Sequence, residues 1–175
     1  GKNEDITYRK IINKGKTFTD ILNCAGKAEI ESLAERSIIN GKTENSFEPY
    51  ATMTRAEFAT IVVNALGLPV KDSVRFEDVS EDSWYAPYVK TAYHYGIVAG
   101  ISPTKFNPDG TITMEEAASM IERAGKLCGI DTDMNILSAK DILEKFGDFN
   151  DISAWAVPSV GFCVKEEILS GDGEN

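Results

Sequence analysis

Arg55 is the side chain whose position most suggests a binding role. It stands in the run Met53-Thr-Arg-Ala-Glu57, where Thr54 and Glu57 are predicted to form a capping box that opens a helix. As the first helical residue, Arg55 opposes the helix dipole at a cost of roughly 0.3–1 kcal/mol. It is therefore either a neutral surface residue or a residue kept to hold an anion, for which a planar guanidinium is well suited.

Residues for catalysis or metal binding are sparse. The only histidine, His94, has no motif around it, and we interpret it as a helix-face residue. The run Asp131-Thr-Asp-Met-Asn135 resembles a calcium loop but has Ile136 and Ile142 where such a loop needs Gly and Glu, so turn and helix-start roles are expected. We expect no enzymatic activity, no cofactor and no metal. The cysteines suggest neither a disulfide framework nor a zinc site and are expected to be buried: Cys24, Cys128 and Cys163.

Charge and composition argue against two classes of partner. The 175 residues carry a formal net charge of −10, with 18 Lys and Arg against 28 Asp and Glu. Nucleic-acid binding needs a basic face, so we expect none. No apolar run approaches the ~20 residues that a membrane span requires, so no membrane partner is expected, and no signal peptide is visible.

A long internal repeat organises the chain. The segment 38–68 aligns without a gap with the segment 97–127, so that Ile38 matches Ile97 and Leu68 matches Leu127. Copies one, two and three each begin with a Phe-x-Asp run, and Trp84 and Gly100 recur at one common offset as Trp155 and Gly171. Copy three therefore has a front half only. The pairs matched by the first alignment include Gly41 with Gly100, Phe47 with Phe106, Pro49 with Pro108, Thr54 with Thr113, and Glu57 with Glu116.

Each copy is predicted to form a helix, a loop and a second helix. In copy two the first helix is expected to run from near Ser83 to Gly96, which can take a left-handed conformation. The second helix is expected to begin at Thr113, after a loop rich in Gly, Pro and Asn. In copy one the second helix, here called the motif helix, is expected between Thr54 and Gly67.

The copies are expected to pack together, because one helix-loop-helix unit cannot bury its apolar face alone. We predict an all-α fold, a pseudo-threefold bundle of helix-loop-helix repeats. Short helices are expected at 141–146, between copies two and three, and at 6–12, over a core that the missing last helix leaves open. The predicted parts are an N-terminal segment at 1–17, repeat 1 at 18–70, repeat 2 at 71–130, and a linking helix with partial repeat 3 at 131–175.

From about Phe18 to Gly171 the chain resembles the S-layer homology (SLH) family. The family pattern runs Phe-x-Asp, Trp, Gly-Ile-x-x-Gly, Phe-x-Pro and Ile-Thr-Arg-x-Glu, and copy two here reads Ile112-Thr-Met-Glu-Glu116 at the last motif. The resemblance implies a secreted module of a Gram-positive bacterium that anchors a surface protein to the cell wall without a covalent bond. The implied ligand is a secondary cell-wall polysaccharide, often carrying a pyruvate ketal, held in grooves between repeats.

The resemblance also implies which residues bind. We expect one competent groove between copies one and two, where Arg55 meets Asp78 and Trp84. A second groove, between copies two and three, is expected to be weaker because Met114 replaces the arginine. A ketal carboxylate suits the arginine and a helix start, and a Trp face suits the sugar ring. The predicted ligand-binding residues are Thr54, Arg55, Asp78, Trp84, Gly100, Asp148 and Trp155.

Other roles remain open at this point. A Trp at a helix start often packs into the core, and Asp78 can cap a turn. The module can also be a degenerate one that mediates protein–protein contacts or assembly, with self-association through the incomplete third repeat. A fragment of an enzyme is the third possibility.

Overall fold

The computed structural model describes residues 1–73 and 76–171, which form helices joined by loops. The predicted all-α fold is confirmed: the elements of this part are helical, and the strand-like pairing in it is an isolated bridge between Thr54 and Thr111. No helix within it is long and apolar enough to cross a bilayer. The elements are η1 (Lys2–Asp5), α1 (Lys27–Glu35), α2 (Arg55–Ala65), α3 (Ala86–His94), α4 (Met114–Leu127), α5 (Ile136–Leu143), η2 (Phe149–Asp151) and α6 (Val157–Lys165).

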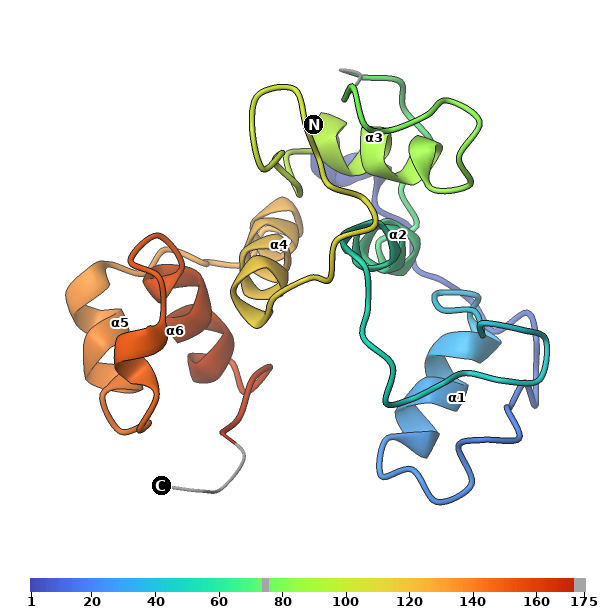
Figure 1. Ribbon diagram of the computed structural model, residues 1–175, viewed down its shortest axis with the longest axis horizontal. Coiled ribbons are helices and arrows are strands. Elements are labelled where there is room, and N and C mark those ends of the chain that lie inside the picture. Colours follow the sequence, from blue (N-terminus) through green and yellow to red (C-terminus); the bar gives the residue numbers. More distant parts are fainter. Residues whose placement is uncertain (74–75, 172–175) are drawn as a thin grey trace.

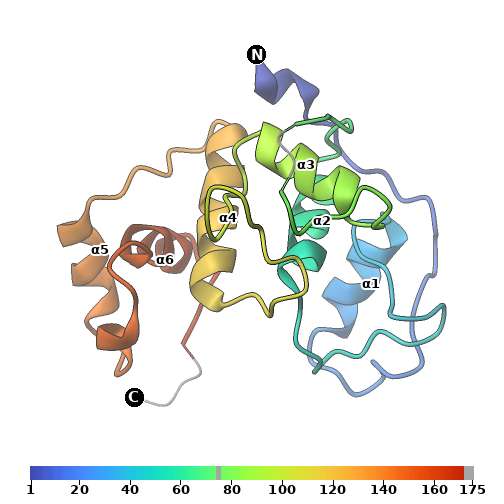
Figure 2. The ribbon, with the colours of Figure 1, turned by 45° about the horizontal axis from the view of Figure 1, so that its top comes forward.

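The helices form three lobes in a row (Figure 1). Helix α1 lies at one end, α2 to α4 lie in the middle, and α5 with α6 lie at the other end. Figure 2 shows the same order after a rotation of the molecule. The motif helices α2 and α4 pack on each other, α2 also packs on α3, and α4 packs on α6. The threefold symmetry of the bundle stays a prediction, since only two motif helices are present in the described residues.

Two buried clusters join the front half of one copy to the motif helix of the copy before it. In the first, Ala59 of α2 and Val89 of α3 are fully buried. In the second, Ala118 of α4 is buried with Ala139 of α5 and Cys163 of α6, which connects the middle lobe to the last one. The copies therefore share their cores, as expected for units too small to fold singly.

The aspartate of each complete copy holds the Phe-x-Pro loop of the same copy. Asp20 accepts hydrogen bonds from the N–H groups of Phe47 and Glu48, at 2.9 and 2.8 Å. The backbone bonds from Phe47 and then Glu48 lower the pKa of Asp20 to about 2. Asp78 makes the equivalent bonds to copy two. Burial acts to raise the pKa of Asp78, but its backbone hydrogen bonds outweigh burial and hold it below its usual value.

A glycine in each copy packs against the phenylalanine that begins the copy. A Cβ placed on Gly100 would lie 2.5 Å from the carbonyl oxygen of Lys105 and 2.8 Å from a ring carbon of Phe76. Close approach, rather than an unusual φ, therefore requires glycine here. The same contact in copy three shows that the partial repeat keeps the local packing of the others. The pairs in contact are Gly41 with Phe18, Gly100 with Phe76, and Gly171 with Phe146.

Helix ends follow the sequence signals closely at the motif helices. Both predicted capping boxes are present, at Thr54 and at Thr113. Gly96 has a φ of 73°, which confirms the left-handed stop predicted there, and Gly67, the predicted stop of α2, is also left-handed with a φ of 58°. The predicted start near Ser83 is wrong: α3 begins at Ala86, because residues 83–86 form a separate turn closed by the Ala86 N–H and the Ser83 carbonyl.

The segment between copies two and three forms its helix earlier than expected. Helix α5 begins after Asn135, whose side chain accepts a hydrogen bond from the Ser138 N–H at 2.8 Å, and it ends at Leu143 instead of continuing to Phe146. This confirms the turn and helix-start role predicted for residues 131–135. The expectation of buried cysteines is confirmed for Cys163, but Cys24 is only half-buried and Cys128 is exposed at the end of α4.

The N-terminal segment caps the ends of helices instead of forming the helix predicted at 6–12. Arg9 donates from Nε to the carbonyl oxygen of Asn64, and the Thr7 N–H donates to that of Leu66, both near the C-terminal end of α2. Tyr95, just after α3, donates to Asp5 at 2.5 Å. Burial, and then this bond, raise the pKa of Tyr95 to about 12.

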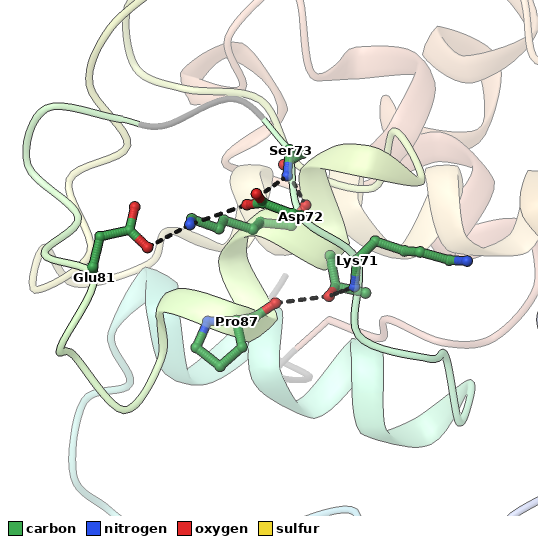
Figure 3. A network of polar contacts seen from close by, with 7 residues as sticks. Lys71, Asp72, Ser73, Glu81 and Pro87 are labelled. Carbon is green, nitrogen blue, oxygen red and sulfur yellow. Dashed lines mark hydrogen bonds and ion pairs between the residues drawn. The ribbon is translucent and has the colours of Figure 1, made fainter.

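The connection between copies one and two is fastened to α3 (Figure 3). The Lys71 N–H donates to the Thr91 hydroxyl, which donates in turn to the carbonyl oxygen of Pro87. The ammonium of Lys90 lies 3.1 Å from Asp72 and 2.6 Å from Glu81. The hydrogen bond with Glu81 raises the pKa of Lys90. A buried cation is thus satisfied by carboxylates on both sides of residues 74–75, and it holds the entry to copy two in place.

The lowered pKa of Asp20 predicts that the folding stability of the chain decreases at acidic pH. Because its pKa is about 2 in the folded chain against an ordinary 3.8, its stabilising effect is complete above about pH 4 and is lost as the pH falls towards 2. Urea unfolding at several pH values should show a smaller loss between pH 4 and pH 2 in Asp20→Asn than in the parent chain. Asp148→Asn is the matched control, since no Phe-x-Pro loop of copy three lies within residues 1–175. Equal acid losses in the Asp20 variant and the parent would contradict this role.

The glycine contact predicts a position that tolerates no Cβ. Gly100→Ala should lower the free energy of unfolding by about 1–3 kcal/mol, because the added methyl group must push the Phe-x-Pro loop away. Gly147→Ala is the control, because a Cβ there has no neighbour within 4 Å, and it should change stability by less than about 0.5 kcal/mol. Thermal unfolding followed by circular dichroism measures both, and equal melting temperatures would contradict the packing argument.

Candidate functional site

Two grooves lie at equivalent places in copies one and two. Groove 1, of about 660 Å³, is bounded by α1, α2 and the loop at 38–53, with Trp84 at its edge. Groove 2, of about 390 Å³, is bounded by α4 and the loop at 99–101, with Trp155 at its edge. The grooves are therefore a repeated feature of the fold. Their matched lining residues are Asn40 and Ala99, Gly41 and Gly100, Lys42 and Ile101, Glu57 and Glu116, Thr60 and Ser119, Ile61 and Met120, and Asn64 and Arg123.

Arg55 lies in groove 2, and it is buried, with only 4% of its surface exposed. Its Nε donates to the carbonyl oxygen of Phe106 at 2.9 Å, and its Nη2 donates to that of Ala99 at 3.2 Å. Its Nη1 pairs with Glu116 at 2.7 Å, and its guanidinium carbon lies 4.8 Å from the centre of the Phe106 ring. The alternative of a neutral surface residue is therefore wrong, because the side chain is buried. Each of these contacts joins copy one to copy two.

The N-terminal end of α2 is already occupied by protein. The N–H groups of Arg55 and Ala56 donate to the carbonyl oxygens of Gly110 and Pro108, at 2.9 and 3.1 Å. Glu57 donates from its N–H to the Thr54 hydroxyl. The free helix start that we expected to attract an anion is consequently not available at α2, and the structure gives Thr54 a capping role.

The structure does not bring Arg55 and Trp84 into one groove. Arg55 meets Gly100 and Trp155 in groove 2, whereas Trp84 lines groove 1. The physical reason is the direction in which α2 packs. Its first turn pairs with the loop of copy two, so the guanidinium reaches α4, and the tryptophan beside α4 belongs to copy three.

Both tryptophans are available to a ligand. Trp84 and Trp155 are each 59% exposed, so neither packs into the core as the alternative interpretation held. The ring of Trp84 meets that of Tyr85 edge to face, with their centroids 5.5 Å apart, and it lines groove 1. An exposed aromatic face beside a groove provides a platform for a sugar ring.

The two aspartates predicted at the site lie away from the groove linings. Asp78 binds the N–H groups of Phe106 and Asn107, as the turn-capping alternative required, and so it supports the carbonyl oxygen that receives Arg55. Asp148 is exposed at the start of η2. Of the predicted residues, groove 2 therefore gathers Arg55, Gly100 and Trp155.

Arg123 lines groove 2 and escaped the sequence analysis. It is exposed, and its Nη1 donates to the carbonyl oxygen of Ile97 at 3.5 Å. Its counterpart in copy one is Asn64, so alignment of the copies does not single it out. The signal that could have found it is its place two helical turns after Glu116, which puts both on one face of α4.

The grooves share a shape but differ in charge. Groove 2 carries two guanidinium groups, Arg55 and Arg123, against the single carboxylate of Glu116. Groove 1 carries Lys42 against three carboxylates, those of Glu29, Glu48 and Glu57. Groove 2 is thus the one that suits an anion. Among the described residues no cluster of His, Cys, Asp and Glu is arranged to hold a metal ion.

Comparison with known proteins matches this repeated architecture. The family model for the S-layer homology domain matches residues 17–59 and 75–118, which correspond to copies one and two. The chain belongs to the S-layer homology family. SLH domains are anchoring modules, and this SLH chain is accordingly placed at the bacterial cell surface, at the cell wall.

Relatives of this SLH segment include surface-layer proteins and enzymes. Exoglucanase XynX of Acetivibrio thermocellus is 33% identical over 94% of this chain and 15% of that protein. The Surface-layer 125 kDa protein of Lysinibacillus sphaericus is 32% identical over 85% of this chain and 12% of that protein. The S-layer protein sap of Bacillus anthracis is 31% identical over 91% of this chain and 19% of that protein. The chain spans less than a fifth of each relative, so the shared part is the SLH module.

The burial of Arg55 predicts a large effect on stability. Arg55→Ala should lower the free energy of unfolding by about 2–4 kcal/mol, because it removes the ion-pair partner of Glu116 and the donor to two carbonyl oxygens. Met114→Ala is the matched control at the same position of α4, where the side chain is 65% exposed, and should cost less than about 0.5 kcal/mol. Urea unfolding of both variants measures the difference. An Arg55→Ala variant as stable as the parent would contradict the interlocking role.

Proposed function

We propose that groove 2 is the ligand-binding site of this anchoring module, and that its ligand is a secondary cell-wall polysaccharide carrying a pyruvate ketal. The ketal carboxylate meets the guanidinium groups of the groove, and a neighbouring sugar ring lies on the face of Trp155. In this proposal the module binds its ligand non-covalently and catalyses no reaction on it. This proposal keeps the ligand class that the sequence favoured and moves it to the groove that carries the cations.

The observation that carries the proposal is the local charge of groove 2. The whole chain has a net charge of −10, yet this groove has two arginines for one glutamate. A short-range excess of positive charge persists within about 8–10 Å of its source, beyond which salt screens the field of the rest of the molecule. An anion that reaches the groove therefore meets attraction from Arg55 and Arg123.

The two arginines have different parts in this proposal. Arg55 is held by Glu116 and two carbonyl oxygens, so it supplies a fixed positive charge at the base of the groove. Arg123 is exposed, so it can turn its fork towards a carboxylate and form two parallel hydrogen bonds. The fixed charge favours the anion in general, and the mobile fork selects a carboxylate.

The exposed pair Arg123 and Trp155 gives the test, since neither residue is part of the core. Arg123→Ala and Trp155→Ala should each weaken binding to purified pyruvylated wall polysaccharide roughly tenfold or more, the effect of losing about 1.5 kcal/mol. Isothermal titration calorimetry at low and at physiological salt measures the affinity, and chemical removal of pyruvate should weaken binding by the parent to the level of Arg123→Ala.

Matched controls come from the other groove. Trp84 has the equivalent place in groove 1, and Met114 stands at the arginine position of copy two. The variants Trp84→Ala and Met114→Ala should therefore bind the polysaccharide as the parent chain does. Equal loss in Trp84→Ala and Trp155→Ala would assign the ligand to both grooves and overturn the choice of groove 2. No binding by the parent chain would favour the alternative, a module used for protein–protein assembly.

A further inference from the structure

A short chain of hydroxyl groups runs from the interface between α4 and α6 to the wall of groove 2. The hydroxyl of Ser159, in α6, donates to the carboxylate of Glu122 at 2.6 Å. The hydroxyl of Ser119, in α4, lies 3.4 Å from that of Ser159, and the two serines are 6% and 5% exposed. Ser119 lines groove 2, whereas Ser159 and Glu122 are not among its lining residues. The chain therefore connects a carboxylate behind the groove with the groove itself.

The carboxylate of Glu122 sets the direction of each proton in this chain. An ionised carboxylate only accepts hydrogen bonds, so the proton of Ser159 is committed to Glu122. The oxygen of Ser159 is then left as an acceptor, and the proton of Ser119 points to it. Among the hydrogen bonds of the described residues, none ends at the Ser119 oxygen. Ser119 therefore offers groove 2 a hydrogen-bond acceptor.

The contact between the two serines is weak by itself. Hydroxyl oxygens that share a hydrogen bond usually lie about 2.7–2.8 Å apart, and these two lie 3.4 Å apart. Hydrogen bonds in a chain polarise and strengthen one another. A donor that binds the oxygen of Ser119 therefore also strengthens the bond from Ser119 to Ser159. A ligand with a donor at this place completes the chain.

The position of Ser119 relates it to the arginine that we propose to hold the ligand. Ser119 and Arg123 are four residues apart on α4 and both line groove 2. Side chains at this spacing lie on one face of a helix, with Cβ atoms about 5–6 Å apart. One hexose unit spans such a distance. A sugar whose ketal carboxylate meets Arg123 can therefore bring one of its ring hydroxyls to Ser119.

We propose that Ser119 is a specificity-determining residue of groove 2, which accepts a hydrogen bond from a free ring hydroxyl of the sugar that carries the pyruvate ketal. Ser159 and Glu122 are the positioning residues that keep its acceptor side available. This inference rests on the ligand proposed for groove 2 and adds a second requirement to it. A sugar that has the carboxylate but lacks this hydroxyl, or carries a substituent on it, is discriminated against.

The test uses a pyruvate-ketal hexoside and its mono-deoxy analogues, in each of which hydrogen replaces one free ring hydroxyl. Isothermal titration calorimetry with the 175-residue protein measures each affinity. The parent chain should bind one analogue roughly fivefold more weakly than the hexoside, the effect of losing one neutral hydrogen bond. Ser119→Ala should bind the hexoside and that analogue equally, because the acceptor is gone.

Two further variants separate a positioning role from a structural one. Ser159→Ala releases the proton of Ser119, which can then turn towards the groove, so the preference for the hexoside should fall to roughly twofold. A purely structural effect would weaken binding of both sugars by the same factor and leave the preference unchanged. Thr60→Ala is the matched control, since Thr60 has the equivalent place in groove 1, and it should keep the full preference. Alanine is favoured in helices, and circular dichroism checks that the three variants fold.

Three outcomes would overturn the inference. The first is a parent chain that binds the hexoside and all of its deoxy analogues equally. The second is a Ser119→Ala variant that keeps the preference of the parent, and the third is a Ser159→Ala variant that keeps it in full. In these cases the parent still binds the hexoside, so the ligand proposed for groove 2 stands. No binding of the hexoside by the parent would overturn the proposed function, and this inference with it.

Discussion

The buried guanidinium of Arg55 is the interaction on which the placement of the two complete copies depends. A cation that is 4% exposed must have its charge and its N–H groups satisfied inside the protein, and the partners of Arg55 all belong to copy two. This requirement fixes the first turn of α2 against the loop of the next copy. Asp78 stabilises that loop by accepting hydrogen bonds from the N–H groups of Phe106 and Asn107. The walls of groove 2 are therefore set by a chain of polar contacts that begins at one side chain.

Much of the fold could be predicted from the repeat, because its signals are local. Capping boxes at Thr54 and Thr113 and left-handed glycines at 67 and 96 act within a few residues of chain, and the structure confirms them. The candidate site was harder to predict than the fold. Alignment of the copies shows which residues are equivalent, but it does not show which copy each side chain contacts. The pairing of Arg55 with Trp155 depends on the packing direction of α2, a tertiary property. Arg123 was missed because its importance arises from the neighbours of α4 and not from the motif.

The two grooves show how one backbone arrangement can be given two electrostatic characters. The lining positions match, but Lys42 and Asn64 of groove 1 are replaced by Ile101 and Arg123 in groove 2. A few side chains at the rim decide the sign of the local charge, because fields in salt solution decay over about 8–10 Å. The strong negative charge of the whole chain, from which we expected no nucleic-acid partner, therefore says little about the ligand of any single groove.

Groove 2 takes its arginine from copy one, its floor from copy two and its tryptophan from copy three. The repeated segment of the sequence is thus out of phase with the unit that forms the groove. A recombination event that exchanged only copy three would transplant a new aromatic platform onto unchanged cations. Insertion of one copy in the middle of the array would alter every groove that spans the junction, even if each inserted residue were correct in itself. The residues of one copy can therefore change only in ways that the adjoining copies accommodate. The character of a groove depends on which copies stand next to each other in the chain.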